Sequence, residues 1–136
     1  TYSILVLEDP LAEDEFANWK KLNETVSEST YLAGDDLVSG NKSRLDKALS
    51  ENLCSAVVIK SNQYATLTEF MDTFALVSSK NIKTIISQRF GETTDDLIAD
   101  VAVGLQANFV KFGSTNRGER VVKYNRLLEI EQEMAV

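Results

Sequence analysis

Five short apolar runs in the sequence each lead into side chains that can do ionic chemistry. The charged side chains in these positions are Glu8, Asp35, Lys60, Arg89 and Lys111. A pair of carboxylates on adjacent strands can bind a hard divalent cation through oxygen, and Mg²⁺ is the natural choice. A lysine beside them can act as a general base, while an arginine and a second lysine can hold a phosphate or carboxylate. Together these groups suggest removal of a proton beside a carboxylate, with a metal stabilising the enolate.

The same charges also have a purely structural interpretation. Glu8 and Asp35 can form salt bridges with Lys60, Arg89 and Lys111 wherever the strand ends meet solvent. Two carboxylates alone also leave a metal site short of ligands, so a third would be needed. Residue types alone leave both interpretations open.

Composition and charge exclude several classes of function. The 136 residues include 14 basic and 21 acidic side chains, giving a net charge of −7, which disfavours binding to nucleic acid or to an anionic membrane. The absence of histidine excludes Ser-His-Asp and Cys-His catalysis. The single cysteine, Cys54, excludes an internal disulfide and is expected to be a core thiol. No apolar run is long enough for a membrane helix, and we expect a cytoplasmic protein.

The spacing of the apolar runs predicts the elements that position these side chains. The runs begin roughly every 26 residues, a spacing that fits a strand, a helix and two loops, and they cover residues 4–7, 31–33, 56–59, 84–86 and 109–110. Apolar residues at helical spacing lie between the runs, and Trp19, Phe70 and Phe74 are expected to pack between helices and sheet. The pattern predicts an α/β fold of five consecutive βα units forming a parallel sheet covered by helices, either doubly wound or part of a (β/α)8 barrel.

Six segments, in order along the chain, resemble the enolase (phosphopyruvate hydratase) family. The resemblance covers the whole chain and corresponds to the last five βα units of that family's barrel. The chain is therefore expected to be one domain, residues 1–136, a partial or half barrel belonging to a longer protein. The matching segments are Leu7-Glu8-Asp9-Pro10, Gly34-Asp35-Asp36-Leu37, Ile59-Lys60-Ser61-Asn62-Gln63, Gly91-Glu92-Thr93-Thr94-Asp95-Asp96, Lys111-Phe112-Gly113 and Arg117-Gly118-Glu119-Arg120-Val121-Val122-Lys123-Tyr124-Asn125.

The resemblance implies a role for each charged side chain. Glu8 and Asp35 fall on two of the three carboxylates that bind catalytic Mg²⁺, and Lys60 falls on the base that takes the α-proton of 2-phosphoglycerate. Arg89 falls on the arginine that binds phosphate, and Lys111 on the lysine that faces the substrate carboxylate. The third metal carboxylate and the glutamates that act as general acid belong to the first half of the family's barrel, which the resemblance does not cover.

Two positions depart from the family's pattern at its active site. Gln88 replaces a histidine and cannot become cationic near neutral pH, and Phe90 replaces a serine that helps hold phosphate and the second metal. These degenerate positions predict that the bulky Phe90 ring occupies the place of the anionic substrate and that catalysis has been lost. If Phe112 is exposed beside Phe90, the two rings form an apolar patch typical of a protein interface.

Three functions remain open at this point. The first is a pseudoenzyme that serves as a scaffold or protein-interaction module, with a protein partner or self-association through open sheet edges. The second is the C-terminal part of an active Mg²⁺-dependent enolase of glycolysis, a lyase that converts 2-phosphoglycerate to phosphoenolpyruvate. The third is a sensor of small anions or metals that uses Lys60, Arg89 and Lys111 without chemistry.

Overall fold

The computed structural model describes residues 3–26 and 28–135. Within these residues five strands alternate with five α-helices, and the 3₁₀ turn η1 follows the third strand. The strands are β1 (Val6–Glu8), β2 (Tyr31–Gly34), β3 (Ala56–Lys60), β4 (Lys83–Ser87) and β5 (Phe109–Lys111). The helices are α1 (Phe16–Val26), α2 (Lys42–Glu51), η1 (Ser61–Gln63), α3 (Leu67–Ser79), α4 (Leu97–Gly104) and α5 (Gly118–Met134).

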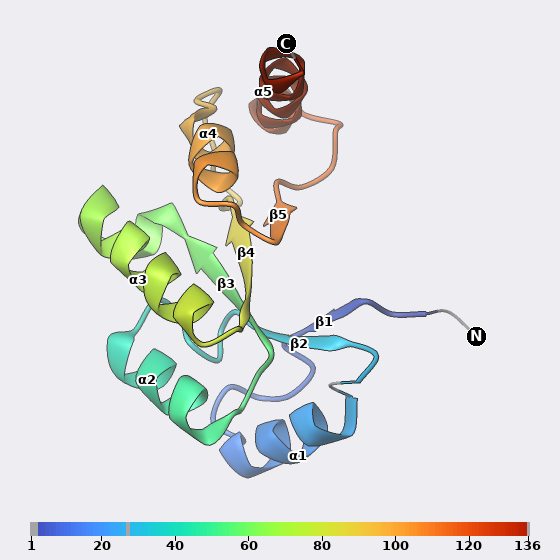
Figure 1. The fold of residues 1–136 in the computed structure, drawn as a ribbon, viewed down its shortest axis with the longest axis vertical. Coiled ribbons are helices and arrows are strands. Elements are labelled where there is room, and N and C mark those ends of the chain that lie inside the picture. The colour runs from blue at the N-terminus through green and yellow to red at the C-terminus, as the bar shows by residue number, and fades with distance from the viewer. Residues whose placement is uncertain (1–2, 27, 136) are drawn as a thin grey trace.

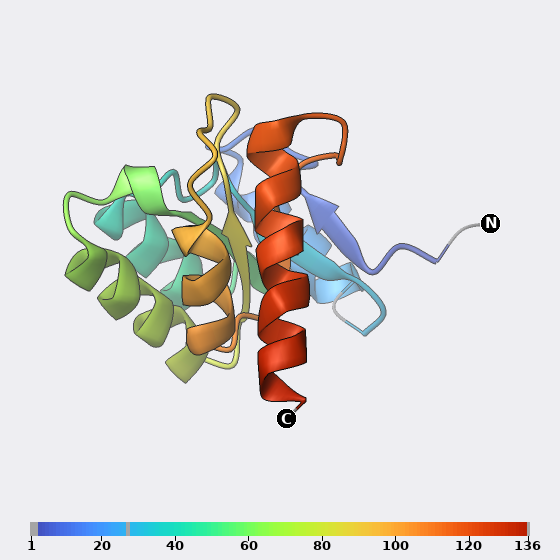
Figure 2. The ribbon, with the colours of Figure 1, turned by 90° about the horizontal axis from the view of Figure 1, so that it is seen from above.

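All five strands form one parallel sheet in chain order, from β1 to β5. The helices lie in an arc along one side of the sheet, again in chain order (Figure 1), and the view from above shows α4 beside α5 (Figure 2). The sheet curls so far that Lys111, at the end of β5, bonds Glu8, at the end of β1. This curled half-barrel of five βα units confirms the α/β fold class predicted from the spacing of the apolar runs.

The main core lies between the sheet and the helices. Every residue of β3 is buried, as expected of a central parallel strand covered on both faces. Trp19, Phe70 and Phe74 are buried in this core, as predicted. On α3, however, Leu67 and Met71 are exposed, because the buried face of that helix runs through Phe70, Phe74 and Val77.

A smaller apolar cluster fills the inner face of the curled sheet. It contains four buried strand residues, Ala33, Ala56, Val58 and Ile85. The rings of Tyr31 on β2 and Phe109 on β5 lie 6.0 Å apart and pack against this cluster. These contacts reach across the curl of the sheet, so the inner face is a packed layer of side chains, as in the interior of a barrel.

The strand boundaries differ from the apolar runs at both ends. Ile4 and Leu5 are exposed, because β1 pairs with β2 only from Val6 onward. At the other end the ladders continue beyond the apolar residues, and Lys60 on β3 pairs in register with Ser87 on β4. The strands therefore place polar side chains within the hydrogen-bonded sheet itself, which fixes their backbone more firmly than a loop would.

Cys54 lies in the core just before β3. Burial raises the pKa of its thiol to about 12, so the group is a neutral thiol at neutral pH, as a core residue should be. Among the described residues, none of the helices has the length and apolar character needed to cross a membrane.

Candidate active site at the mouth of the half-barrel

Four of the predicted side chains form one ionic network at the carboxyl ends of the strands. Lys60 Nζ donates to both carboxylate oxygens of Asp35, with 2.6 Å to Oδ2. Lys111 Nζ lies 2.6 Å from Glu8 Oε1 and 3.3 Å from Asp35 Oδ2. Asp35 and Lys60 are buried, whereas Glu8 and Lys111 are partly exposed. The salt bridges expected on structural grounds are therefore present for Lys60 and Lys111, and they gather around Asp35.

The network fixes the charge of its members. Burial raises the pKa of the Asp35 carboxyl group, but the hydrogen bond and charge of Lys60, together with Lys111, outweigh burial and hold the pKa below its ordinary value. Burial lowers the pKa of Lys111, but Glu8 and Asp35 outweigh it, so the pKa lies above its ordinary value. At neutral pH Asp35 is a carboxylate and Lys111 an ammonium.

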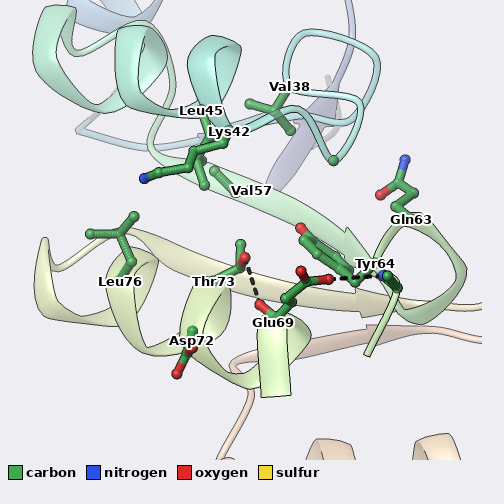
Figure 3. A pocket seen from close by; sticks show the side chains of 12 residues that line it. Val38, Lys42, Leu45, Val57, Gln63, Tyr64, Glu69, Asp72, Thr73 and Leu76 are labelled. Atoms are coloured by element: carbon green, nitrogen blue, oxygen red, sulfur yellow. Dashed lines mark hydrogen bonds between the residues drawn. The ribbon is translucent and has the colours of Figure 1, made fainter. Parts of the chain in front are cut away.

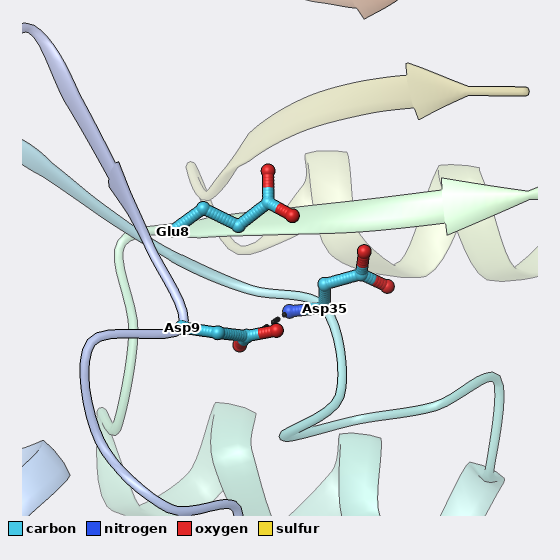
Figure 4. A group of neighbouring side chains, drawn as sticks. All are labelled: Glu8, Asp9 and Asp35. Atoms are coloured by element: carbon cyan, nitrogen blue, oxygen red, sulfur yellow. Dashed lines mark hydrogen bonds between the residues drawn. The ribbon is translucent and has the colours of Figure 1, made fainter.

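Asp9 is a third carboxylate at this site, with a role that the sequence did not reveal. Single oxygens of Glu8, Asp9 and Asp35 all lie within 4.8 Å of one another (Figure 4). Asp9 uses its two oxygens to accept the backbone N–H groups of Asp35 (3.0 Å) and Asp36 (2.8 Å). Its backbone takes a left-handed conformation, with φ of 42°. Asp9 therefore fixes the backbone of Asp35. The sequence feature that could have indicated this role is that Asp9 directly follows Glu8.

The donor set suits a hard divalent cation. Glu8 and Asp35 offer carboxylate oxygens from adjacent strands, the ligand type that Mg²⁺ prefers. In this structure a positive charge already lies between them, because the Lys111 ammonium bonds both carboxylates. The Lys111 ammonium thus occupies the position between the two carboxylates that a metal ion would take. The carboxylates fit a metal ion at this position, and Lys111 would have to move away to admit it.

The structure places Arg89 and Phe90 at the surface, outside this network of ion pairs. Arg89 is exposed, and its backbone N–H donates to Glu92 Oε1 at 2.7 Å. Phe90 is 80% exposed, and the Arg117 guanidinium carbon lies 5.9 Å from the centre of its ring. The ring faces solvent and Arg117 among the described residues, and its place relative to the substrate stays a prediction.

The expected apolar patch of Phe90 and Phe112 is also absent from the described surface. Phe112 is fully buried and packs against Tyr124 of α5, with ring centres 6.1 Å apart. It follows β5 directly and joins the main core between sheet and helices. Phe90 is thus a single exposed ring, which needs no interface to explain it.

Gln88 is buried at the end of β4, close to the loop that follows β5. Its backbone N–H donates to Lys111 O at 3.2 Å, and its side-chain Oε1 has no partner. Nε of Arg120 is likewise buried and unpartnered. Both side chains press against Gly113, which has φ of 76°. Gly113 thus lets the Lys111 strand end approach Gln88 closely.

Replacing Gly113 by alanine is expected to destabilise the chain by about 1–3 kcal/mol, because alanine is strained at this φ. The added Cβ would also lie 2.8 Å from Gln88 Nε2. Urea unfolding followed by circular dichroism measures the change. Gly91→Ala is the matched control, since a Cβ there meets nothing within 4 Å. Equal stability of the two variants would contradict this account of the loop.

A separate cavity of about 490 Å³ lies on the helical side of the sheet, between α2 and α3 (Figure 3). Val57 of β3 lies among its apolar lining residues, and Tyr64 projects into it. Burial raises the pKa of the Tyr64 hydroxyl, so the group is neutral at neutral pH. None of the five predicted charged side chains lines this cavity, so the ionic chemistry belongs to the mouth of the half-barrel.

The family model described as Enolase, C-terminal TIM barrel domain, matches residues 1–136. The chain belongs to the enolase family. Two curated relatives are named Enolase, one from Metallosphaera sedula at 44% identity and one from Helicobacter hepaticus at 43%. The matches cover 99% and 98% of this chain and 32% of each relative. The chain therefore spans about a third of the length of these enolases.

These relatives correct the expected loss of catalysis. A pseudoenzyme acting as a scaffold was inferred from Gln88 and Phe90, yet the chain matches proteins named Enolase over nearly its whole length. The findings favour the alternative interpretation, a segment of an enolase.

Proposed function

We propose that this chain supplies part of the active site of a Mg²⁺-dependent enolase, which converts 2-phosphoglycerate to phosphoenolpyruvate and water in glycolysis. One observation carries the proposal: Glu8, Asp35, Lys60 and Lys111 meet at one mouth, with a positive charge held between two carboxylates. Family membership supplies the reaction, and the geometry agrees with it. The proposal concerns the whole protein, of which these residues would form one side of the site.

The chain's own residues divide the work of the proposed reaction. Lys60 Nζ acts as a neutral amine in this step: it accepts the proton from C2 of the substrate and becomes an ammonium, which Asp35 holds in place through its two oxygens. Lys111 faces the substrate carboxylate, and Arg89 binds the phosphate as a planar donor. The C3–O bond then breaks, a double bond forms between C2 and C3, and the departing hydroxide takes a proton from a group outside these residues.

Glu8 and Asp35 are the residues proposed to hold Mg²⁺. When bound, the ion supplies positive charge that stabilises the substrate carboxylate as the C2 proton leaves. Lys111, which bonds both carboxylates in this chain, would have to turn away from them to face the substrate carboxylate. Asp9 keeps Asp35 in register throughout, through the two backbone N–H groups that it accepts.

The two edge strands suggest how the site is completed. In the described sheet β1 pairs with β2 and β5 pairs with β4, so each edge strand has one neighbour. We propose that these edges pair with further polypeptide, as the greater length of the relatives suggests. A second copy of the chain remains the alternative partner, and a cytoplasmic location stays a prediction.

Metal binding tests the proposal directly. Calorimetric titration with Mg²⁺ is expected to detect binding to the protein that carries this chain, and Asp35→Asn should weaken it by about tenfold or more because a ligand charge is lost. In the same protein, formation of phosphoenolpyruvate should stop when a chelator removes Mg²⁺ and return when the ion is restored.

Asp46→Asn is the matched control for the titration, because Asp46 is an exposed carboxylate on α2 that pairs with Lys42. Its Mg²⁺ affinity should equal that of the unchanged protein. If Asp35→Asn and Asp46→Asn weakened Mg²⁺ binding equally, Asp35 would not be a metal ligand. Absence of phosphoenolpyruvate under all metal conditions would refute the enolase function.

A further inference from the structure

Lys123 on α5 is a fully buried lysine that the proposed reaction does not use. Its side chain is 1% exposed, a rare state for lysine. Its Nζ is surrounded by oxygen atoms, three of them backbone carbonyls and one a carboxylate. These partners are Thr93 O (3.1 Å), Asp95 O (2.9 Å), Glu119 O (2.8 Å) and Glu92 Oε2 (3.2 Å).

Three of these four partners belong to the loop between β4 and α4. That loop carries Arg89, and it leads into α4 at Leu97. The contacts of Lys123 with Thr93 and Asp95 therefore tie the loop to α5, an element that follows it in the sequence by more than twenty residues. A buried ammonium with oxygen partners on all sides is a rigid anchor, because each lost bond would leave buried charge unsatisfied.

Glu92 connects the buried Lys123 to the backbone of Arg89. One of its carboxylate oxygens pairs with Lys123, and the other accepts the backbone N–H of Arg89 at 2.7 Å. The Arg89 side chain is exposed, so the loop backbone sets the position from which the guanidinium projects. A charge-assisted bond to that backbone N–H is stronger than an ordinary amide bond.

We propose that Lys123 and Glu92 are positioning residues that set Arg89 for binding of the substrate phosphate. The inference rests on the proposed function for the identity of the ligand. Lys123 touches no reacting group; it holds Glu92, and Glu92 holds the backbone from which the Arg89 guanidinium projects. A displacement of that guanidinium weakens its hydrogen bonds to the phosphate, because these bonds depend on both distance and angle.

A neighbouring ion pair on the same helix provides the control. Arg126, one turn after Lys123, bonds Asp100 of α4 at 2.8 Å. Glu92 and Asp100 are thus both carboxylates paired with cations of α5, but only Glu92 also accepts the Arg89 N–H. Glu92→Gln and Asp100→Asn each remove one such charge and keep the shape of the side chain.

The kinetic test compares these two variants in the whole protein that carries this chain. Glu92→Gln should raise the KM for 2-phosphoglycerate by about tenfold or more, with a smaller change in kcat. Asp100→Asn should leave KM within about twofold of the unchanged protein. Amide hydrogen exchange at Arg89 should become faster in Glu92→Gln and in Lys123→Met, but not in Asp100→Asn.

The outcomes separate this inference from the proposed function. The positioning role would be overturned if Glu92→Gln left both the KM and the amide exchange of Arg89 unchanged. Equal effects of Glu92→Gln and Asp100→Asn would also overturn it. If the protein shows no turnover at all, the proposed function fails, and calorimetric titration with inorganic phosphate becomes the decisive measurement. Weaker phosphate binding in Glu92→Gln than in Asp100→Asn then supports the inference, and equal binding or no binding overturns it.

Discussion

Lys60→Met is expected to reduce the kcat for conversion of 2-phosphoglycerate by about 100- to 10,000-fold, the range lost with a general base. Methionine keeps the length of the buried side chain but has no basic nitrogen to accept the C2 proton. The Lys60 Nζ bonds Asp35, the centre of the ionic network, and its removal leaves the barrel mouth without its proposed base. Initial-rate kinetics on the whole protein, with phosphoenolpyruvate as the measured product, gives the result.

Lys83→Met is the matched control for this experiment. Lys83 begins β4, at the opposite end of the barrel from the ionic network, and its Nζ lies 5.7 Å from the centre of the Tyr31 ring. Its removal should leave kcat unchanged within about twofold. If Lys60→Met raised KM and left kcat intact, Lys60 would be a binding group, and the role of general base would be wrong.

Periodicity was enough to predict a parallel α/β sheet, because burial on both faces produces continuous apolar runs, but the choice of a half barrel over a doubly wound sheet came from the family resemblance. Residues 56–59 are a continuous apolar run, and they form the central strand β3 with every residue buried. Apolar spacing alone does not show that Leu67 and Met71 of α3 lie outside the core, because one apolar stripe fits two rotations of a helix about its axis. Only the packing of Phe70, Phe74 and Val77 against the sheet shows which rotation is adopted.

The sequence predicted the part of the candidate site that is formed by side chains at strand ends. Glu8, Asp35, Lys60 and Lys111 each end or follow a strand of one parallel sheet, so the topology places them at one edge, and the curl of the sheet brings Lys111 of β5 to Glu8 of β1. Two features of the site depend on backbone conformation and side-chain direction, which the sequence pattern does not record. One is the left-handed turn that aims Asp9 at the backbone of Asp35, and the other is the outward direction of Phe90.

The buried pair of Asp35 and Lys60 is expected to dominate the stability of the barrel mouth. Asp35→Leu should destabilise the chain by about 3–5 kcal/mol, because it leaves the Lys60 ammonium buried without its carboxylate. The double variant Asp35→Leu/Lys60→Met should recover most of that loss, since two apolar side chains can replace a buried ion pair at little cost. Urea unfolding of the single and double variants, followed by circular dichroism, measures both effects.

The pH dependence of the same unfolding experiment shows whether the Asp35 charge is the cause. Because the folded pKa of Asp35 lies below its ordinary value, the carboxylate makes its full contribution to stability at any pH above that ordinary pKa. This contribution to the free energy of unfolding is lost as the pH falls through the folded pKa. The difference in free energy of unfolding between the unchanged chain and Asp35→Leu should therefore become smaller in acid. The exposed pair of Lys42 and Asp46 is the control, and Asp46→Leu should cost less than about 1 kcal/mol. If Asp35→Leu cost no more than this control, Lys60 would have another partner at the mouth, and Asp35 would not be the centre of the network.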